Sequence, residues 1–341
     1  MKTKVVGKML VRQLNIEGFR GIRKCKEPLE LSKFTVLIGR NNSGKSAVLE
    51  SLYLPLLSLR SSDSAYDIDR LGLLSRLHGG PSSLVYAYSG VAEVDYTINE
   101  RKVAVEVDAG GNAKLLMDGA EMMRPLDSLA DILGTEPNFT AVGRTIFFIP
   151  NETSLLKGLV DRIENVENWN LIVKTGAHVS VVEELVNKCV DDRYTEVLLS
   201  PGLCLRKELA LNYASGRNFL YIKLPDLGDG LKKAVAVSLW LETYKPKMVL
   251  WDDFEASAHP SLIRQLLEWL SKKDWQVILS THSIDVLSKL LEVRPKDAKV
   301  LQLRKTRDDI LIHGSFSMEE LESVMEEAQH DPRLLVDALK L

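Results

Sequence analysis

The sequence has few of the features that mark secreted, disulfide-bonded or membrane-spanning chains. Only three cysteines occur in 341 residues, Cys25, Cys189 and Cys204, and their wide spacing fits neither a metal site nor a disulfide framework. We therefore expect reduced cysteines and a cytoplasmic protein. No uninterrupted apolar run reaches about 18 residues, so no segment is predicted to span a bilayer. The apolar run that begins at Met9 is too short for a signal peptide.

A strong excess of charge of one sign is also absent. The formal net charge is −3, which argues against a protein coated in phosphate-binding side chains. The first 26 residues are an exception, because they contain a single acid, Glu17. The basic residues there are Lys2, Lys4, Lys8, Arg12, Arg20, Arg23, Lys24 and Lys26. This stretch predicts either a solvated surface or a weak, non-specific contact with nucleic acid.

Internal repeats, low-complexity tracts and sustained heptads are missing, which excludes solenoids and long coiled coils. Strand and helix patterns instead alternate at both ends of the chain. We expect one composite head made of an N-terminal lobe over 1–120, a mainly helical insert over 121–200 and a C-terminal lobe over 201–341. The fold class predicted is α/β, with a mixed sheet, an antiparallel β meander and the helical insert.

The predicted elements follow from hydrophobic periodicity and from turn residues. In the N-terminal lobe they are strands Val11–Ile16 and Phe34–Ile38, helix Ser46–Leu54, and a meander of Val91–Ile98, Lys102–Val107 and Ala113–Met117. The insert contains one buried strand, Thr145–Ile149. The C-terminal lobe has helix 230–243, strand Met248–Trp251, helix Pro260–Leu270, strand Gln276–Leu279, helix Ile284–Leu291, a hairpin of Val300–Leu303 and Asp309–His313, and helix 317–329. The consecutive βαβ units imply parallel strands.

A phosphate-binding loop is predicted between the strand Phe34–Ile38 and the helix that follows it. Gly39-Arg-Asn-Asn-Ser-Gly44-Lys45-Ser46 satisfies the pattern G-x-x-x-x-G-K-[ST]. The two glycines let the backbone turn so that successive amide N–H groups point at phosphate oxygens. The N–H groups of Asn41, Asn42 and Ser43 are among them. Lys45 supplies positive charge to the β- and γ-phosphates, and the Ser46 hydroxyl can bind Mg²⁺. The predicted ligands are ATP and Mg²⁺.

Polar residues follow two apolar strands of the C-terminal lobe. Asp252 and Asp253 come directly after Met248–Trp251, and His282 follows the next strand. Because ligands of open α/β sheets bind at the carboxyl ends of strands, these side chains should lie beside the phosphate loop. We expect Asp252 to hold magnesium, Asp253 to polarise the attacking water and His282 to reach the γ-phosphate. Taken alone, a solvated strand end remains the alternative for the aspartates.

The combination resembles the ABC-class ATPases related to SMC and RecF proteins, and most of all the single-chain ATPases of the OLD type. The matching segments are Leu14–Arg23, Leu224–Lys233, Trp251–Pro260 and Leu279–Ser283. The resemblance implies that Arg20 belongs to the nucleotide site and that Gly228 and Gly230 form the signature motif. It also implies that Glu255, two residues after Asp253, is a further catalytic candidate and that His282 is the switch histidine.

The sequence departs from the family pattern in four places. Asp253 replaces the usual catalytic glutamate, and Gly228-Asp-Gly230 is a shortened signature for which a plain loop capped by Asp229 is the alternative. No glutamine occurs between Ser46 and Arg264, and His78-Gly-Gly occupies roughly the place of the family's Q-loop glutamine. Too few residues follow the last predicted βαβ unit for the TOPRIM nuclease of OLD proteins.

Three functions are compatible with these features. The first is an ATP-hydrolysing head that forms a homodimer on ATP and gates a nucleic acid or a partner protein, one that a neighbouring gene could encode. The second is a non-hydrolysing ATP switch in an interaction complex, which the shorter Asp253 favours. The third is the nucleotide-binding subunit of a transporter, which the missing Q-loop glutamine and full signature argue against.

Overall fold

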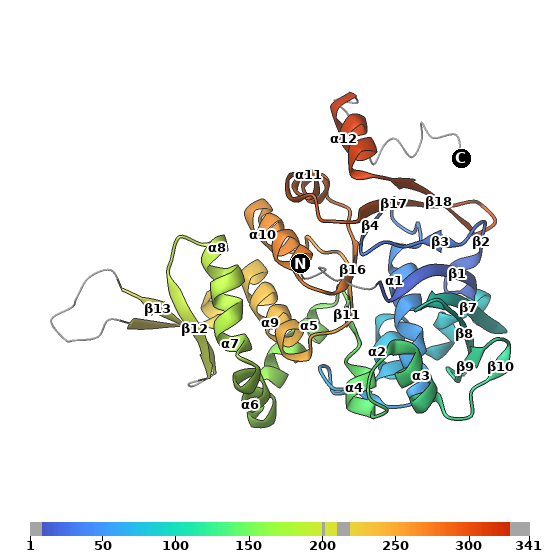
Figure 1. Ribbon diagram of the computed structural model, residues 1–341, viewed down its shortest axis with the longest axis horizontal. Coiled ribbons are helices and arrows are strands. Elements are labelled where there is room, and N and C mark those ends of the chain that lie inside the picture. The colour runs from blue at the N-terminus through green and yellow to red at the C-terminus, as the bar shows by residue number, and fades with distance from the viewer. Residues whose placement is uncertain (1–8, 200–201, 210–218, 328–341) are drawn as a thin grey trace, which may run out of the picture.

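A 13-stranded mixed sheet forms the centre of the computed structural model, which describes residues 9–199, 202–209 and 219–327 (Figure 1). Its strands are β1 (Val11–Phe19), β2 (Ile22–Cys25), β3 (Leu29–Glu30), β4 (Phe34–Ile38), β7 (Val91–Ile98), β8 (Arg101–Asp108), β9 (Ala113–Met117), β10 (Ala120–Glu121), β11 (Ile146–Ile149), β15 (Met248–Trp251), β16 (Gln276–Ser280), β17 (Ala298–Lys305) and β18 (Ile310–Phe316). The order across the sheet is β10-β9-β8-β7-β1-β2-β18-β17-β4-β16-β15-β11, and β3 pairs with β1. The predicted fold class is confirmed.

One half of the sheet is parallel. Strand β4 pairs in parallel with β16 and with β17, β16 pairs with β15, and β15 pairs with β11. Every residue of β4, β11, β15 and β16 is buried, which explains why these strands are apolar except for Thr35, Gln276 and Ser280. The strands are connected through helices α1 (Lys45–Tyr53), α9 (Asp229–Tyr244), α10 (Pro260–Ser271) and α11 (Ile284–Val293). The carboxyl ends of β4, β11, β15 and β16 therefore meet at one edge.

The other half is the antiparallel meander that the sequence predicts. Strand β7 pairs with β1 on one side and β8 on the other, and β8 continues to β9. Buried and exposed residues alternate along β7, so one face packs on the core and the other meets solvent. Asn99 and Glu100 both have positive φ, 46° and 68°, as a two-residue hairpin turn of type I′ requires.

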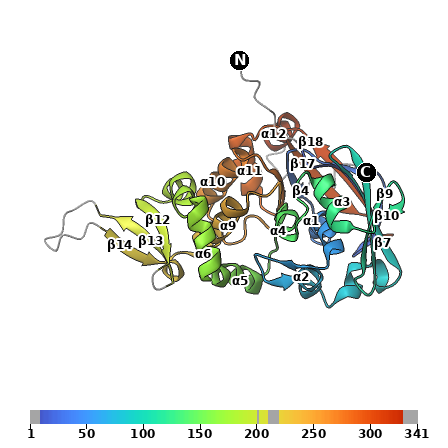
Figure 2. The same cartoon turned by 60° about the horizontal axis from the view of Figure 1, so that its bottom comes forward.

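A helical region covers the edge strand β11, and a small sheet projects from it on the side away from the meander (Figures 1 and 2). The remaining helices are α2 (Arg70–Leu77), α3 (Pro125–Leu133), α4 (Phe139–Gly143), α5 (Thr153–Ile163), α6 (Val166–Thr175), α7 (Ala177–Val181), α8 (Asn187–Cys189) and α12 (Met318–Glu327). The small sheets are β5 (Ser62–Asp63) with β6 (Ile68–Asp69), and β12 (Tyr194–Leu199) with β13 (Leu203–Glu208) and β14 (Phe219–Lys223).

The structure differs from the sequence prediction in a few elements. The three-stranded sheet β12-β13-β14 was not predicted, and β12 begins inside the stretch expected to be helical. The helix after the phosphate loop ends at Tyr53 and continues as a 3₁₀ helix, Leu54–Leu59, with Pro55 in its first turn, where the absent N–H costs nothing. The predicted end of the last helix, at 329, lies outside the described residues.

The three predicted segments of the chain share one sheet, because β11 of the insert pairs with β15 of the C-terminal lobe. The core beneath this junction contains Trp240 and Trp251, which are among the largest fully buried side chains. Within the described residues, no helix combines the length and apolarity that crossing a membrane needs.

Candidate nucleotide-binding site

The backbone of the phosphate loop needs glycine at its first position. Gly39, Asn42 and Gly44 all have positive φ, 149°, 62° and 102°. A Cβ atom on Gly39 would lie 2.4 Å from the carbonyl oxygen of Leu303 and 2.6 Å from the Ser43 hydroxyl oxygen. Gly39 is thus required both by backbone conformation and by the close approach of β17.

Two polar side chains of the loop point into this tight turn. The Lys45 ammonium donates to the carbonyl oxygens of Gly39 and Arg40, each at 3.1 Å. Burial lowers the pKa of Lys45, and the carboxylates of Asp253, Asp252 and Glu255 oppose that shift. The Ser43 hydroxyl is buried and has no hydrogen-bond partner among the described residues. A phosphate oxygen would satisfy such a group.

The Ser46 hydroxyl, at the start of α1, lies near the carboxylate of Asp252, which follows β15, and acts on it as a donor that lowers its pKa. The Ser280 hydroxyl donates to Asp252 Oδ1 at 2.5 Å and accepts the Asp253 N–H at 2.9 Å. Burial raises the pKa of Asp252, while these two hydroxyl donors lower it. A hydroxyl and a carboxylate in contact beside a phosphate loop form the donor set that Mg²⁺ prefers, so Ser46 and Asp252 fit this ion.

Asp253 and His282 lie together at the same strand edge. Asp253 Oδ1 is 3.7 Å from His282 Nε2, and Asp253 Oδ2 accepts a hydrogen bond of 2.8 Å from the Asn151 amide. Asp253 has a positive φ of 44°, so its backbone turns sharply after the strand. Sequence reasoning did not single out Asn151. Its position two residues after the buried strand β11 could have indicated it, since β11 ends at the same edge.

Glu255 holds the backbone of the switch-histidine segment. Its Oε1 atom accepts the His282 N–H at 2.8 Å, whereas its Oε2 atom is buried without a hydrogen-bond partner among the described residues. The sequence named Glu255 as a catalytic candidate. In this structure its one hydrogen-bonded oxygen is directed at the backbone of His282, and Asp253 contacts the histidine ring.

Arg20 is held by two side chains that the sequence did not identify as site residues. Its guanidinium donates to Glu50 Oε1 at 2.9 Å and lies 3.3 Å from His78 Nδ1. His78 Nε2 in turn lies 3.0 Å from the same Glu50 oxygen, and the Glu50 side chain is only 2% exposed. His78 therefore contacts Arg20 and, on α1, Glu50, and it occupies roughly the position where the sequence lacks a Q-loop glutamine.

A cavity of about 280 Å³ brings most of the predicted residues together. Its lining is Arg20, Gly21, Ile22, Asn41, Asn42, Ser43, Gly44, Lys45, Ser46, Ala47, His282 and Lys305. Gly39 does not line the cavity but packs against Leu303 and against Ser43 of the same loop. Asp252 does not line it either, but lies near Ser46, which does.

Gly228 and Gly230 are absent from that lining. Gly228 is the N-cap residue of α9, and its Cβ would meet open space. A Cβ on Gly230 would lie 2.3 Å from the carbonyl oxygen of Ser257, so this glycine allows α9 to approach the loop that follows the aspartates. The alternative in which Asp229 caps the helix is wrong. Asp229 is the first helical residue and pairs with Lys232 at 3.0 Å.

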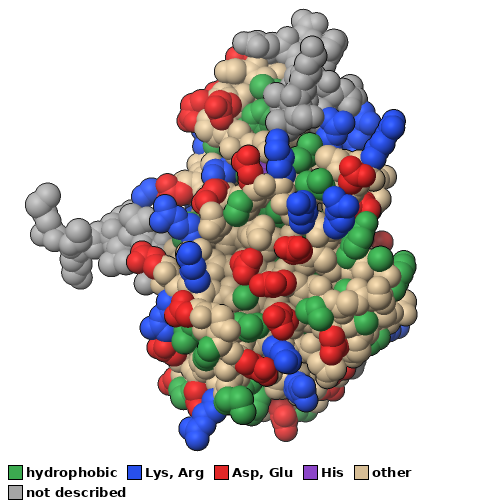
Figure 3. All heavy atoms as spheres, turned by 90° about the vertical axis from the view of Figure 1, so that its right-hand side faces the viewer, with side chains coloured by type: hydrophobic (Ala, Val, Ile, Leu, Met, Phe, Trp, Pro, Cys, Tyr) green, Lys and Arg blue, Asp and Glu red, His purple; other side chains and the backbone are tan. Residues whose placement is uncertain are grey.

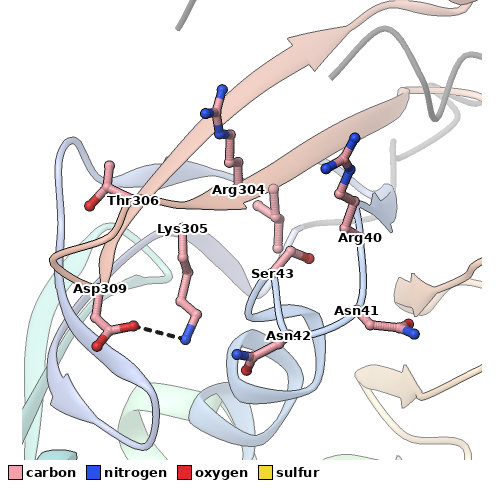
Figure 4. Close-up of a pocket in the computed structure, with 9 residues that line it drawn as sticks. Arg40, Asn41, Asn42, Ser43, Arg304, Lys305, Thr306 and Asp309 are labelled. Atoms are coloured by element: carbon pink, nitrogen blue, oxygen red, sulfur yellow. Dashed lines mark hydrogen bonds and ion pairs between the residues drawn. The ribbon is translucent and has the colours of Figure 1, made fainter. Parts of the chain in front are cut away.

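A second cavity, of about 310 Å³, lies between the phosphate loop and the β17–β18 hairpin (Figure 4). Arg40 enters it from the loop and Arg304 from β17, and Lys305 pairs with Asp309 at 3.2 Å. Lys305 also donates to the Gly21 carbonyl oxygen at 2.8 Å and lines both cavities. The phosphate loop thus forms the wall between two polar cavities.

Comparison with known families identifies the chain. Residues 60–288 match the family model described as "AAA domain, putative AbiEii toxin, Type IV TA system", and residues 9–90 match the model of an AAA ATPase domain. The chain belongs to this AAA-domain family. This family and the relatives below support the ATP-binding, ABC-type ATPase of the SMC and RecF group that the motifs indicated.

Two sequence relatives support the assignment. The DNA replication and repair protein RecF of Anaeromyxobacter sp. (strain Fw109-5) is 33% identical over 150 residues, 44% of this chain and 34% of the relative. An uncharacterized protein of Methanocaldococcus jannaschii is 30% identical over 107 residues, 29% of this chain and 90% of that protein. The chain therefore spans about a third of the length of RecF.

Solved SMC heads share the fold. The Smc head bound to the C-terminal winged-helix domain of ScpA has a TM-score of 0.61 at 18% identity, covering 93% of this chain and 99% of that one. The SMC head domain from Thermotoga maritima has a TM-score of 0.51 at 16% identity, covering 91% and 100%.

Proposed function

We propose that this protein hydrolyses ATP with Mg²⁺ and that its ATP-bound form is a homodimer that gates a partner protein or a nucleic acid. The observation that carries the proposal is the contact of Ser46 with Asp252 beside the pair Asp253–His282. This contact puts a phosphate loop, a magnesium donor set and a candidate general base at one edge of the sheet.

The chain's own groups have distinct roles in this reaction. Amide groups of the loop and the Lys45 ammonium bind the β- and γ-phosphates. Mg²⁺, held by Ser46 and Asp252, would supply charge stabilisation to the phosphate oxygens. Asp253, oriented by Asn151, accepts a proton from the water that attacks the γ-phosphorus, and ADP leaves. His282 lies where it can donate to the γ-phosphate, with Glu255 fixing its backbone.

Dimerisation would complete the site. Gly228 does not line its own subunit's cavity, yet it is the N-cap residue of a helix of 16 residues, and a Cβ on it would meet open space. A second copy related by a two-fold axis could bring that helix N-terminus to the γ-phosphate, where its dipole favours negative charge. The γ-phosphate would then stabilise the dimer, and hydrolysis would release it. SMC heads with this fold were solved with ScpA, which supports a protein as the gated partner.

Turnover measurements separate this proposal from the non-hydrolysing switch. The switch is favoured by the short Asp253 side chain and its engagement by Asn151. Phosphate release over many cycles with Mg-ATP, lost when Mg²⁺ is chelated, supports hydrolysis. ATP binding with less than one phosphate released per chain would contradict hydrolysis and leave the switch.

A further inference from the structure

Arg20 lines the nucleotide cavity from the turn between β1 and β2, and its charge is anchored on α1. The guanidinium donates to Glu50 Oε1 at 2.9 Å, and the Glu50 side chain is only 2% exposed. Glu50 lies one helical turn after Ser46, so it shares a face of α1 with a residue that lines the same cavity. Water hardly competes for a carboxylate that is so buried, and this bond therefore holds Arg20 firmly.

The contacts of His78 specify which of its ring nitrogens carries the proton. Its Nδ1 atom lies 3.3 Å from the Arg20 guanidinium, and its Nε2 atom lies 3.0 and 3.1 Å from the two Glu50 oxygens. A guanidinium only donates, so Nδ1 accepts, and an ionised carboxylate only accepts, so Nε2 donates. One form of the ring meets both conditions, the neutral imidazole with its proton on Nε2. Each donor among the three side chains then faces an acceptor.

The segment that carries His78 also holds the backbone of Arg20. The Arg20 N–H donates to the Leu84 carbonyl oxygen at 2.9 Å, and Phe19 forms an isolated antiparallel bridge with Val85. Arg20 needs such support, because its φ of 52° lies in the left-handed region that residues other than glycine rarely adopt. A single segment therefore fixes both the main chain and the side chain of this arginine.

Two contacts set the orientation of the guanidinium plane. The NH1 group of Arg20 is bonded to Glu50, and its NH2 group faces His78. Each contact uses one N–H group, and a guanidinium carries more of them, so donors remain for an anion in the cavity. Arg20 and Lys45 line the same cavity, and two cations in one cavity favour a phosphate ligand.

We propose that His78 is a positioning residue of the nucleotide site. In its neutral form with the proton on Nε2, it holds Arg20 against Glu50 so that the guanidinium binds a phosphate of the nucleotide. This role rests on the nucleotide site of the proposed function and does not depend on hydrolysis.

Calorimetric titration with Mg-ADP tests the role without turnover. His78→Phe keeps a ring and removes both nitrogens, and it should weaken ADP binding about tenfold, the scale of a lost hydrogen bond to a charged group. Arg20→Met should weaken binding at least as much. In the Arg20→Met background, His78→Phe should change the Kd less than about twofold, because His78 acts through Arg20. An equal effect of His78→Phe with and without Arg20 would overturn the proposal.

Two further variants separate hydrogen bonding from packing. His78→Gln keeps a donor and an acceptor, so its Kd should stay within about threefold of the wild type. Equal losses in His78→Gln and His78→Phe would show that ring packing matters instead, and would contradict the role. His178→Ala is the matched control, because His178 is 16% exposed, against 19% for His78, and its Nε2 lies 3.9 Å from Glu196 Oε2. It lines neither cavity and should leave ADP affinity unchanged.

Long-range proton–nitrogen NMR correlations of the histidine rings test the tautomer in the wild-type protein. At about pH 8, where imidazole is in general neutral, the His78 signals, assigned from their loss in His78→Gln, should show the proton on Nε2. A proton on Nδ1 would overturn the proposal, even if His78→Phe does not fold. Wild-type protein that releases no phosphate, but shows this tautomer and the expected ADP affinities, would refute the ATPase function and support the role of His78.

Discussion

Lys45 is the first residue to test. Its ammonium donates to two carbonyl oxygens of the loop and interacts electrostatically with the carboxylates at the strand edge. Lys45→Ala should abolish ATP binding or reduce it at least about tenfold, because a charge on the β- and γ-phosphates is lost. Its bonds within the protein are to two backbone oxygens of the loop itself, so the fold should persist. Calorimetric ATP titration and thermal unfolding of the same sample measure both effects. Wild-type affinity in this variant would contradict the phosphate-loop assignment.

Asp253 is the carboxylate that contacts both Asn151 and His282. Asp253→Asn keeps its size and removes its charge, so the variant should bind ATP yet turn over about 100-fold more slowly, the usual scale for a lost general base. Glu255→Gln is the comparison, because Glu255 bonds the His282 backbone instead. If Glu255→Gln stops hydrolysis while Asp253→Asn does not, the general base is Glu255. Phosphate release under saturating Mg-ATP measures both.

The site residues that belong to motifs could be predicted from the sequence. The residues that contact and orient them could not. Lys45, Ser46, Asp252 and His282 follow a loop pattern or a buried strand, and parallel strands bring such positions to one edge. Glu50, His78 and Asn151 belong to none of these motifs. Their contacts depend on helix rotation and on side-chain reach across elements, which one-dimensional spacing does not encode.

The phosphate loop is the element whose backbone is most constrained. Gly39→Ala would combine a φ of 149° with a Cβ 2.4 Å from the Leu303 oxygen, so β4 and β17 would have to separate locally. We expect the free energy of unfolding to fall by at least about 2 kcal/mol, and ATP affinity to fall with it. Denaturant unfolding measures the first. Gly228→Ala, whose Cβ meets open space, is the control and should lose less than about 1 kcal/mol.

Element prediction succeeded where one buried environment dictated the sequence. Strands β4 and β15 have the predicted bounds, because each is a short buried run, apolar except for Thr35, between a lysine and a glycine or aspartate, and such a run admits little else. The sheet β12-β13-β14 was missed. Charged residues interrupt its strands, and on β14 four of five residues are exposed, so no period-2 pattern marks them. Such strands are stabilised mainly by pairing with each other, which the sequence does not display.

The molecule as a whole should bind nucleic acid weakly, if it binds it. Part of the basic N-terminal stretch lies on β2 next to the β17–β18 hairpin, since Arg23 donates its N–H to Asp309 and Lys24 pairs with Ile310. Lys2, Lys4 and Lys8 lie outside the described residues. On the face in Figure 3, acidic and basic side chains are interspersed, without a continuous basic stripe. Binding to random-sequence DNA should therefore fall steeply between 50 and 200 mM salt, by about tenfold or more. Sequence-specific binding that persists at high salt in a filter or anisotropy assay would contradict this.

The assembly state tests the whole-molecule proposal, and the structure selects the variant for it. Gly230 is unsuitable for a bulky substitution, because its Cβ would meet the Ser257 carbonyl in the same subunit. Gly228 has open space around it, so Gly228→Arg should leave the folded monomer intact while blocking a partner's γ-phosphate from the N-terminus of α9.

Light scattering with and without Mg-ATP gives the readout. Slow Asp253→Asn protein should accumulate as an ATP-dependent dimer, because the contacts that hold the dimer are removed only by hydrolysis. The double variant Asp253→Asn, Gly228→Arg should be a monomer with Mg-ATP. Its ATP affinity should change by less than about threefold, since Gly228 does not line its own subunit's cavity. Turnover per chain of the wild type should rise with protein concentration, because two copies are needed to complete each site. A monomer in every nucleotide state, with turnover per chain independent of concentration, would show that one head hydrolyses ATP alone.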